Sequence, residues 1–147
     1  MQKIKQLFMT YRNGVVADTL RKAGLPHKVI FGLQLPQIVE IARSLAEDHG
    51  AGALDDLASR LWADSEVRES RILALRLASP GNITREKAIA LAESIRSREE
   101  ADLLVFYLLR HTEHLPAVAE HIASGESQLP SEGLDSYLLR VIQRNQA

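Results

Sequence analysis

The sequence has no cysteine among its 147 residues. Disulfide bonds, thiolate zinc sites and thiol nucleophiles are therefore excluded. Long apolar runs are also lacking, because no uncharged stretch approaches the roughly 20 residues that a membrane-spanning helix needs. The opening residues MQKIKQLFMTYRN carry charge where a signal peptide has its apolar centre. We therefore expect a cytoplasmic protein without a membrane segment.

Sequence signals for cofactor or metal chemistry are lacking as well. The chain has no phosphate-cradling glycine motif, no nucleophile elbow and no dinucleotide-binding fingerprint. His111, Glu113 and His114 lie close together, but they do not form the HExxH pattern of a zinc protease. Histidines near a helix end commonly complement the helix dipole, and His121 follows Glu120 without a third obvious ligand. We expect neither a metal ion nor an organic cofactor.

What the chain does have is apolar residues at helical spacing almost throughout. They make up 46% of the sequence beside 25% charged residues, a balance typical of a folded soluble protein. No segment shows the alternation of a strand, so the predicted class is all-α. The predicted helices lie within residues 2–12, 15–24, 36–50, 53–64, 65–81, 83–97, 97–112, 115–125 and 133–145.

The prolines and the loop lengths indicate how these helices are arranged. Pro36, Pro80 and Pro116 separate helices of about 10 to 15 residues that are joined by short loops. This spacing predicts antiparallel helix pairs stacked as HEAT-like repeats, whose period is about 40 residues, in a single domain over residues 1–147. Internal similarity is poor, so periodicity alone leaves a compact helical bundle as the alternative.

Several helix starts can be predicted from local capping signals. Ser65 and Thr84 are candidate N-caps, and Pro36 suits a first turn. Ser97 followed by Glu100 matches a capping box, in which each side chain accepts a hydrogen bond from the other residue's backbone N–H. Ser97 and Glu100 thus need no functional explanation.

Asp102 does not fit this local account. It lies beyond the first turn of its helix, where Asp is a poor helix former and the dipole effect has mostly faded. It also borders the apolar stripe formed by Ala101, Leu104, Val105 and Leu108. A carboxylate beside an apolar wall is solvated, paired or functional, so Asp102 is a candidate for chemistry.

The net charge of −1 hides an uneven distribution along the chain. Residues 1–43 carry seven Lys and Arg against two acids, and residues 60–98 carry eight basic against five acidic side chains. Residues 99–147 carry three arginines against eight acids. A polyanion could therefore bind the first two thirds of the chain, while the last third would repel it. The alternative is that these charges solvate the outer faces of amphipathic helices.

Three consecutive blocks resemble a known family. FGLQLPQIVEIARSL (31–45), LWADSEVRESRILALRLASP (61–80) and NITREKAIALAESIRSREEAD (82–102) are similar to the AlkD-like DNA alkylation repair glycosylases. The matching positions are Gly32, Pro36, Leu61, Trp62, Glu69, Arg71, Ala74, Ser97 and Asp102. The resemblance implies HEAT-like repeats that cradle duplex DNA and excise cationic alkylated bases, with Asp102 in the place of the catalytic aspartate. From the residues alone, we expect Trp62 and Glu69 to be structural.

The chain also departs from the family pattern. Arg98 stands where the family's Ser-Trp-Asp-x-x-Asp signature has its tryptophan, and Glu99 replaces the first aspartate. Arg98 precedes Asp102 by one helical turn, so we expect the two to pair. Two functions follow: a DNA-binding repair protein with Asp102 as its catalytic or vestigial carboxylate, or a non-catalytic HEAT-like scaffold that binds a protein partner, or nucleic acid without excision. In the first, the expected phosphate contacts are Arg68, Arg71, Arg76, Arg85, Lys87 and Arg98.

Overall fold

A computed structural model describes residues 1–127, 129 and 133–146. Its described residues form helices and loops, and the only β-type pairing among them is one parallel bridge between Val29 and Val67. The predicted all-α helical repeat class is confirmed. The contacts divide the chain into two compact units, Met1–Ala78 and Ser79–Ala147. The single domain expected over residues 1–147 stays a prediction.

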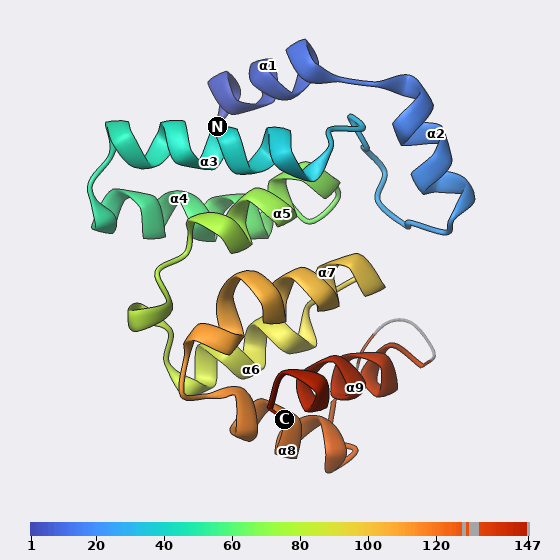
Figure 1. The fold of residues 1–147 in the computed structure, drawn as a ribbon, viewed down its shortest axis with the longest axis vertical. Helices are drawn as coiled ribbons and strands as arrows, with labels where there is room; N and C mark the ends of the chain where they lie inside the picture. Colours follow the sequence, from blue (N-terminus) through green and yellow to red (C-terminus); the bar gives the residue numbers. More distant parts are fainter. Residues whose placement is uncertain (128, 130–132, 147) are drawn as a thin grey trace. The chain divides into compact units, whose positions relative to one another are not determined.

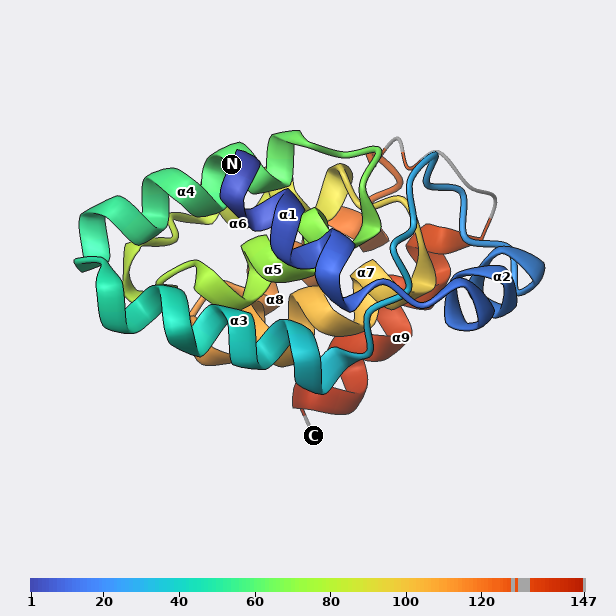
Figure 2. The same cartoon turned by 90° about the horizontal axis from the view of Figure 1, so that it is seen from above.

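Unit 1 is built from five helices. They are α1 (Gln2–Tyr11), α2 (Gly14–Lys22), α3 (Leu35–Asp48), α4 (Ala51–Ala63) and α5 (Arg68–Leu77). Helices α3 and α4 are joined by a short loop and run antiparallel, and α5 packs against both (Figure 1). In the view from above, α1 lies over α5 (Figure 2). An ion pair of 3.2 Å joins Lys5 of α1 to Asp64 at the end of α4.

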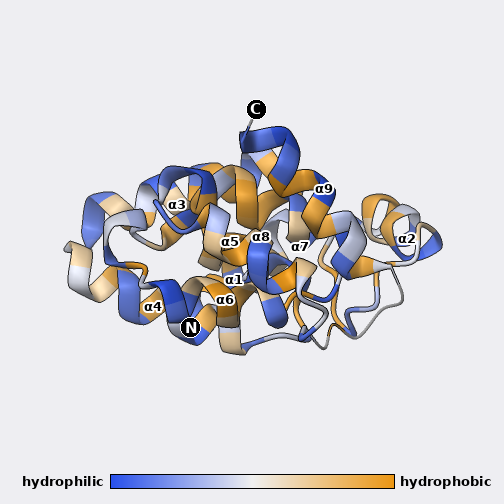
Figure 3. Ribbon diagram, turned by 90° about the horizontal axis from the view of Figure 1, so that it is seen from below, coloured by the Kyte–Doolittle hydropathy of each residue, from blue (hydrophilic) through white to orange (hydrophobic). Residues whose placement is uncertain are grey.

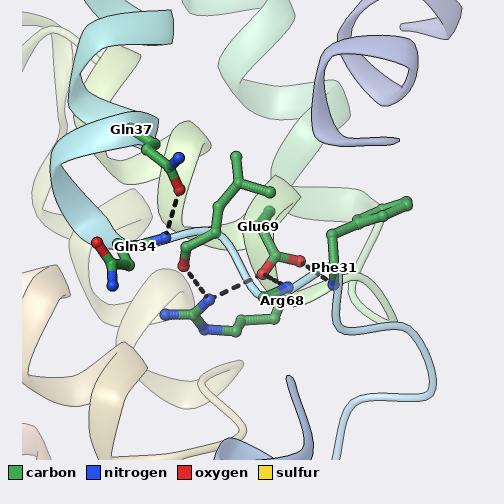
Figure 4. A network of polar contacts seen from close by, with 7 residues as sticks. Phe31, Gln34, Gln37, Arg68 and Glu69 are labelled. Atoms are coloured by element: carbon green, nitrogen blue, oxygen red, sulfur yellow. Dashed lines mark hydrogen bonds and ion pairs between the residues drawn. The ribbon is translucent and has the colours of Figure 1, made fainter. Parts of the chain in front are cut away.

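A buried ion pair fixes the loop that leads into α3. Glu69 of α5 has no exposed surface, and its carboxylate accepts hydrogen bonds from the backbone N–H groups of Phe31 (3.0 Å) and Gly32 (3.1 Å). Arg68 donates to the same carboxylate and to the carbonyl of Leu33, both at 2.8 Å (Figure 4). The structural role expected for Glu69 is thus confirmed, and its two backbone partners are more than 35 residues away.

Gly32 allows the same loop to approach α2 closely. Its φ of +87° lies in the left-handed region, and a Cβ built there would come within 2.1 Å of the Asn13 carbonyl oxygen. Asn13 in turn caps α2, because its side chain accepts hydrogen bonds from the N–H groups of Val15 and Val16. A glycine is therefore required at this position by both backbone conformation and space.

Unit 2 contains the helices that follow Pro80. A short 3₁₀ turn (Pro80–Asn82) leads to α6 (Arg85–Glu93), α7 (Arg98–Leu103), α8 (Leu115–Ala123) and α9 (Leu134–Gln146). Helix α8 packs against α6 and α9, and α9 packs against α7. Figure 3 shows hydrophilic and hydrophobic stripes on single helices such as α3 and α9, as the helical spacing predicts. The fully buried residues of unit 2 include Ile95, Leu104, Leu108, Leu109 and Leu138.

Two local predictions differ from the structure. Ser65 is not an N-cap, because α5 begins at Arg68 with Val67 before it. Val67 is held extended by its bridge to Val29, a long-range pairing that local capping signals do not reveal. The predicted helix over 97–112 also changes character after Leu103, where a π-helical segment (Leu104–Leu108) and a 3₁₀ turn (Leu109–His111) follow.

None of the helices in the described ranges has the length and apolar character needed to cross a bilayer.

Candidate functional site

The candidate site begins at the N-terminus of α7. Ser97 is the N-cap, and its hydroxyl oxygen accepts a hydrogen bond of 3.1 Å from the N–H of Glu100, as predicted. The Glu100 carboxylate reaches back one residue further than a standard capping box and accepts from the N–H of Arg96 at 3.0 Å. Both side chains are buried. These two hydrogen bonds fix the first turn of α7 and thereby the direction in which the Asp102 side chain projects from the helix.

Asp102 is half-buried, and its partner comes from α9. The hydroxyl of Tyr137 lies 2.8 Å from one carboxylate oxygen of Asp102 and 2.9 Å from the other. A hydroxyl has a single proton to donate, so the two oxygens share one hydrogen bond. The carboxylate keeps most of its acceptor capacity, since an ionised Asp offers about four lone-pair sites. Asp102 is therefore held in place and still able to stabilise a positive charge.

Arg98 contacts the tyrosine and not the carboxylate. Its guanidinium carbon lies 4.8 Å from the centre of the Tyr137 ring, and that of Arg140 lies 5.9 Å from it. We expected an ion pair between Arg98 and Asp102, but among the described residues these two side chains form none. The reason is that Tyr137 occupies the space beside the carboxylate and presents its ring to the guanidinium, an attractive cation-π geometry.

The electrostatics of the site favour the neutral phenol. The pKa of Tyr137 is raised above its usual value of 10.0, mainly because burial penalises the phenolate and further because the hydroxyl donates to Asp102. The charges of Arg144 and Arg98 act in the opposite direction but are smaller. At neutral pH, Tyr137 therefore remains a hydrogen-bond donor to the carboxylate.

The segment after Asp102 presents an aromatic side chain to solvent. The π-helical stretch buries Leu104, Val105 and Leu108 but leaves Phe106 51% exposed. The guanidinium of Arg110 lies 4.0 Å from the centre of the Phe106 ring. A π-helical turn holds an extra residue, and such turns are frequent at functional sites. This arginine-aromatic contact is separate from the two that involve Tyr137.

The two arginines at the start of α5 are buried. Arg68 is 3% exposed and Arg71 5% exposed, whereas a phosphate contact requires an accessible guanidinium. Arg68 donates to Leu33 and Glu69, as described above, and the Arg71 guanidinium lies 3.9 Å from the centre of the Trp62 ring. Their burial removes Arg68 and Arg71 from the set of accessible phosphate contacts.

The other expected phosphate contacts are exposed. Arg76 lies in the last turn of α5 in unit 1, and Arg85 and Lys87 lie in the first turn of α6 in unit 2. Thr84 caps α6 as predicted, since its hydroxyl oxygen accepts from the N–H of Lys87 at 3.1 Å. Arg98 is exposed at the start of α7. The contact of these four cations with DNA stays a prediction.

Two of the histidines each contact one neighbouring side chain. Arg110 donates through Nε to the ring of His111 at 3.3 Å, and His121 of α8 pairs with Glu93 of α6. The Glu93 partner was not evident from the sequence, because the two residues are 28 positions apart. Over the described residues, no group of three or more His, Asp or Glu side chains is placed to hold a metal ion.

Sequence reasoning also missed Tyr137. It is 35 residues away from Asp102, and nothing in the local pattern of α9 distinguishes it from a packing residue. The only available signal is that it is one of three tyrosines in a chain with few aromatic residues. A tyrosine that is half-buried commonly finds a hydrogen-bond partner for its hydroxyl, but the partner's identity requires the fold.

Comparison with known proteins gives one match. A family model described as "DNA alkylation repair enzyme" matches residues 4–124, a span that contains Asp102 and the exposed cations but ends before α9. No curated protein and no solved structure matches the chain.

Proposed function

Because the chain belongs to the DNA alkylation repair enzyme family, we propose that it binds duplex DNA and excises cationic alkylated purines by hydrolysing the N-glycosidic bond. Asp102 is the catalytic carboxylate in this proposal. The observation that carries it is the position of Asp102, half-buried on α7 and oriented by the Tyr137 hydroxyl. Family membership by itself supports only the broader role in alkylation repair.

The reaction requires from the protein mainly a negative charge at the correct position. As the bond between the sugar C1′ and the base nitrogen breaks, the alkylated base leaves as a neutral molecule and positive charge develops on the deoxyribose. A preorganised carboxylate stabilises this charge most effectively where water is partly excluded. A water molecule then adds to C1′ and releases a proton. Neither a metal ion nor an organic cofactor takes part in this reaction.

Binding to the DNA backbone is assigned to the exposed cations Arg76, Arg85, Lys87 and Arg98. Each phosphate contact releases counterions from the duplex, so binding should weaken steeply as salt increases. Arg76→Ala should lower the salt dependence by about one phosphate contact. Arg43→Ala is a suitable control, because Arg43 is an exposed arginine of the same unit that is not among the expected phosphate contacts. An unchanged slope in Arg76→Ala would remove Arg76 from the interface.

The decisive experiment measures release of 3-methyladenine and 7-methylguanine from alkylated duplex DNA. Asp102→Asn keeps the shape of the side chain and an acceptor for Tyr137 but removes the charge. We expect release to fall by about 10²- to 10³-fold, as for loss of one electrostatic stabiliser at an active site. Glu113→Gln is the matched control, because Glu113 is an exposed carboxylate of the same unit.

Each outcome decides between the two functions. Release that depends on Asp102 supports the glycosylase. Release that is equal in Asp102→Asn and the wild-type protein excludes Asp102 from the mechanism. Duplex binding without any release supports a non-catalytic DNA-binding protein of the same family. A wild-type protein that neither binds duplex at low salt nor releases base overturns the proposal and favours the scaffold for a protein partner.

A further inference from the structure

The ring of Tyr137 stands beside Asp102, and the two side chains are joined by the tyrosine hydroxyl. An aromatic face next to a carboxylate is the combination that binds planar or quaternary cations, because both groups attract positive charge. The two groups come from helices α7 and α9, which pack against each other.

A cation already lies against the aromatic ring of this pair. The Arg98 guanidinium, itself a planar cation, lies 4.8 Å from the centre of the Tyr137 ring. This separation is within the distance of about 6 Å over which cation-π attraction is appreciable. Arg140, one turn after Tyr137 on α9, lies at 5.9 Å and thus at the limit of that range. Arg98 is exposed, so its side chain can leave the ring without disturbing a packed core.

We infer that Tyr137 and Asp102 form a binding site for a planar cation, and that Arg98 covers the Tyr137 ring of this site until a cationic ligand displaces it. The ligand class, a purine that carries a positive charge through alkylation, rests on the proposed function. The site selects for charge, since a neutral purine cannot replace the guanidinium on equal terms. Arg98 is therefore an internal competitor of the ligand, and its removal should strengthen binding.

Free nucleosides separate this effect from DNA binding. 7-Methylguanosine carries the positive ring under mildly acidic conditions and has no phosphate, so any role of Arg98 in phosphate contact does not enter. Guanosine is the matched neutral ligand. Affinities of the full chain for both can be measured by NMR titration of the aromatic resonances.

We expect Arg98→Ala to bind 7-methylguanosine about 2- to 5-fold more tightly than the wild-type protein, which corresponds to an exposed cation-π contact. Guanosine binding should stay unchanged. Arg110→Ala is the matched control, because Arg110 contacts the ring of Phe106 at 4.0 Å and not that of Tyr137. Adding Tyr137→Leu to Arg98→Ala should abolish the gain.

The inference is overturned if Arg98→Ala binds 7-methylguanosine no more tightly than the wild-type protein, or if guanosine gains equally. Undetectable binding of 7-methylguanosine by Arg98→Ala overturns it as well. Far-UV circular dichroism of each variant checks that the helices are intact, and the decision rests on Arg98→Ala because that side chain is exposed. Failure of the proposed function gives a different result. A gain in nucleoside affinity without duplex binding or base release would support the cation site and exclude the glycosylase function.

Discussion

Replacing Glu69 by Gln should destabilise unit 1 severely, although the change alters only a few atoms. The carboxylate is fully buried, with Oε1 accepting from Phe31 and Oε2 accepting from both Gly32 and Arg68. A glutamine offers one acceptor oxygen, and its amide group donates. If the glutamine oxygen takes the place of Oε2, the Phe31 N–H faces the amide NH2 group, which is also a donor. In the other orientation, the amide NH2 group faces the donors of Gly32 and Arg68.

The magnitude follows from this geometry. A buried donor without an acceptor costs about 1–3 kcal/mol. Removing one partner of a buried ion pair costs about 3–5 kcal/mol, a figure that already includes part of the first term. We therefore expect Glu69→Gln to lower the free energy of unfolding by about 3–5 kcal/mol, against a total of about 5–15 kcal/mol for a typical domain. With a urea dependence of about 2 kcal/mol per molar, the unfolding midpoint should fall by about 2 M.

Urea denaturation followed by tryptophan fluorescence tests this prediction. Trp62 is the only tryptophan and lies on α4 of unit 1, so its fluorescence reports the unit that contains Glu69. Glu47→Gln is the control, because Glu47 is an exposed partner of Arg43 whose loss should cost less than about 1 kcal/mol. If Glu69→Gln shifts the midpoint no more than Glu47→Gln does, the buried network does not stabilise the loop as argued.

Two further predictions concern backbone space and the Tyr137 hydrogen bond. Gly32→Ala should destabilise unit 1 by more than the roughly 1–2 kcal/mol of a left-handed alanine, because its Cβ would meet the Asn13 carbonyl. Gly24→Ala has a similar φ of +99° in open space and should cost only the conformational part; equal losses in urea denaturation would contradict the clash. Tyr137→Phe should lower the free energy of unfolding by about 1 kcal/mol at neutral pH. Since the folded pKa of Tyr137 is raised, the stability it provides is present below about pH 10 and lost as pH rises through the folded pKa, so the difference between wild type and variant should shrink there. A difference that grows above about pH 10, measured by far-UV circular dichroism, would refute this sign.

Local signals in the sequence were sufficient for most of the fold. The Thr84 and Ser97 caps and the first-turn Pro36 are features of adjacent residues, and the structure has all three in place. The start of α5 was predicted incorrectly at Ser65, because the pairing of Val67 with Val29 spans the whole of α3 and α4. A pairing of this length has no local signature.

The burial of two arginines of α5 could not be predicted from the sequence. Charged residues in a helix normally lie on its solvent face, so Arg68 and Arg71 were expected to be accessible. The structure instead uses Arg68 to anchor a loop and stacks Arg71 on Trp62, both inside unit 1. The Leu33 carbonyl that accepts from Arg68 is 35 residues away in the sequence, so this partner emerges only from the fold.

The positive charge of Arg98 repels any second cation that approaches the Tyr137 ring. A cationic purine about 5 Å from the Arg98 guanidinium would be repelled by about 3 kcal/mol at an effective dielectric constant of about 20. This exceeds the 0.5–1 kcal/mol or so that a cation gains from an exposed aromatic ring. Both cations therefore cannot share the Tyr137 ring. Since Arg98 is exposed and its side chain can change rotamer on the nanosecond timescale, displacement is the less costly solution. Once Arg98 has moved away, the Asp102 charge acts on the ligand without that opposing charge. We therefore expect arginine at position 98 to weaken binding of a cationic base and to leave the Asp102 carboxylate able to act on it.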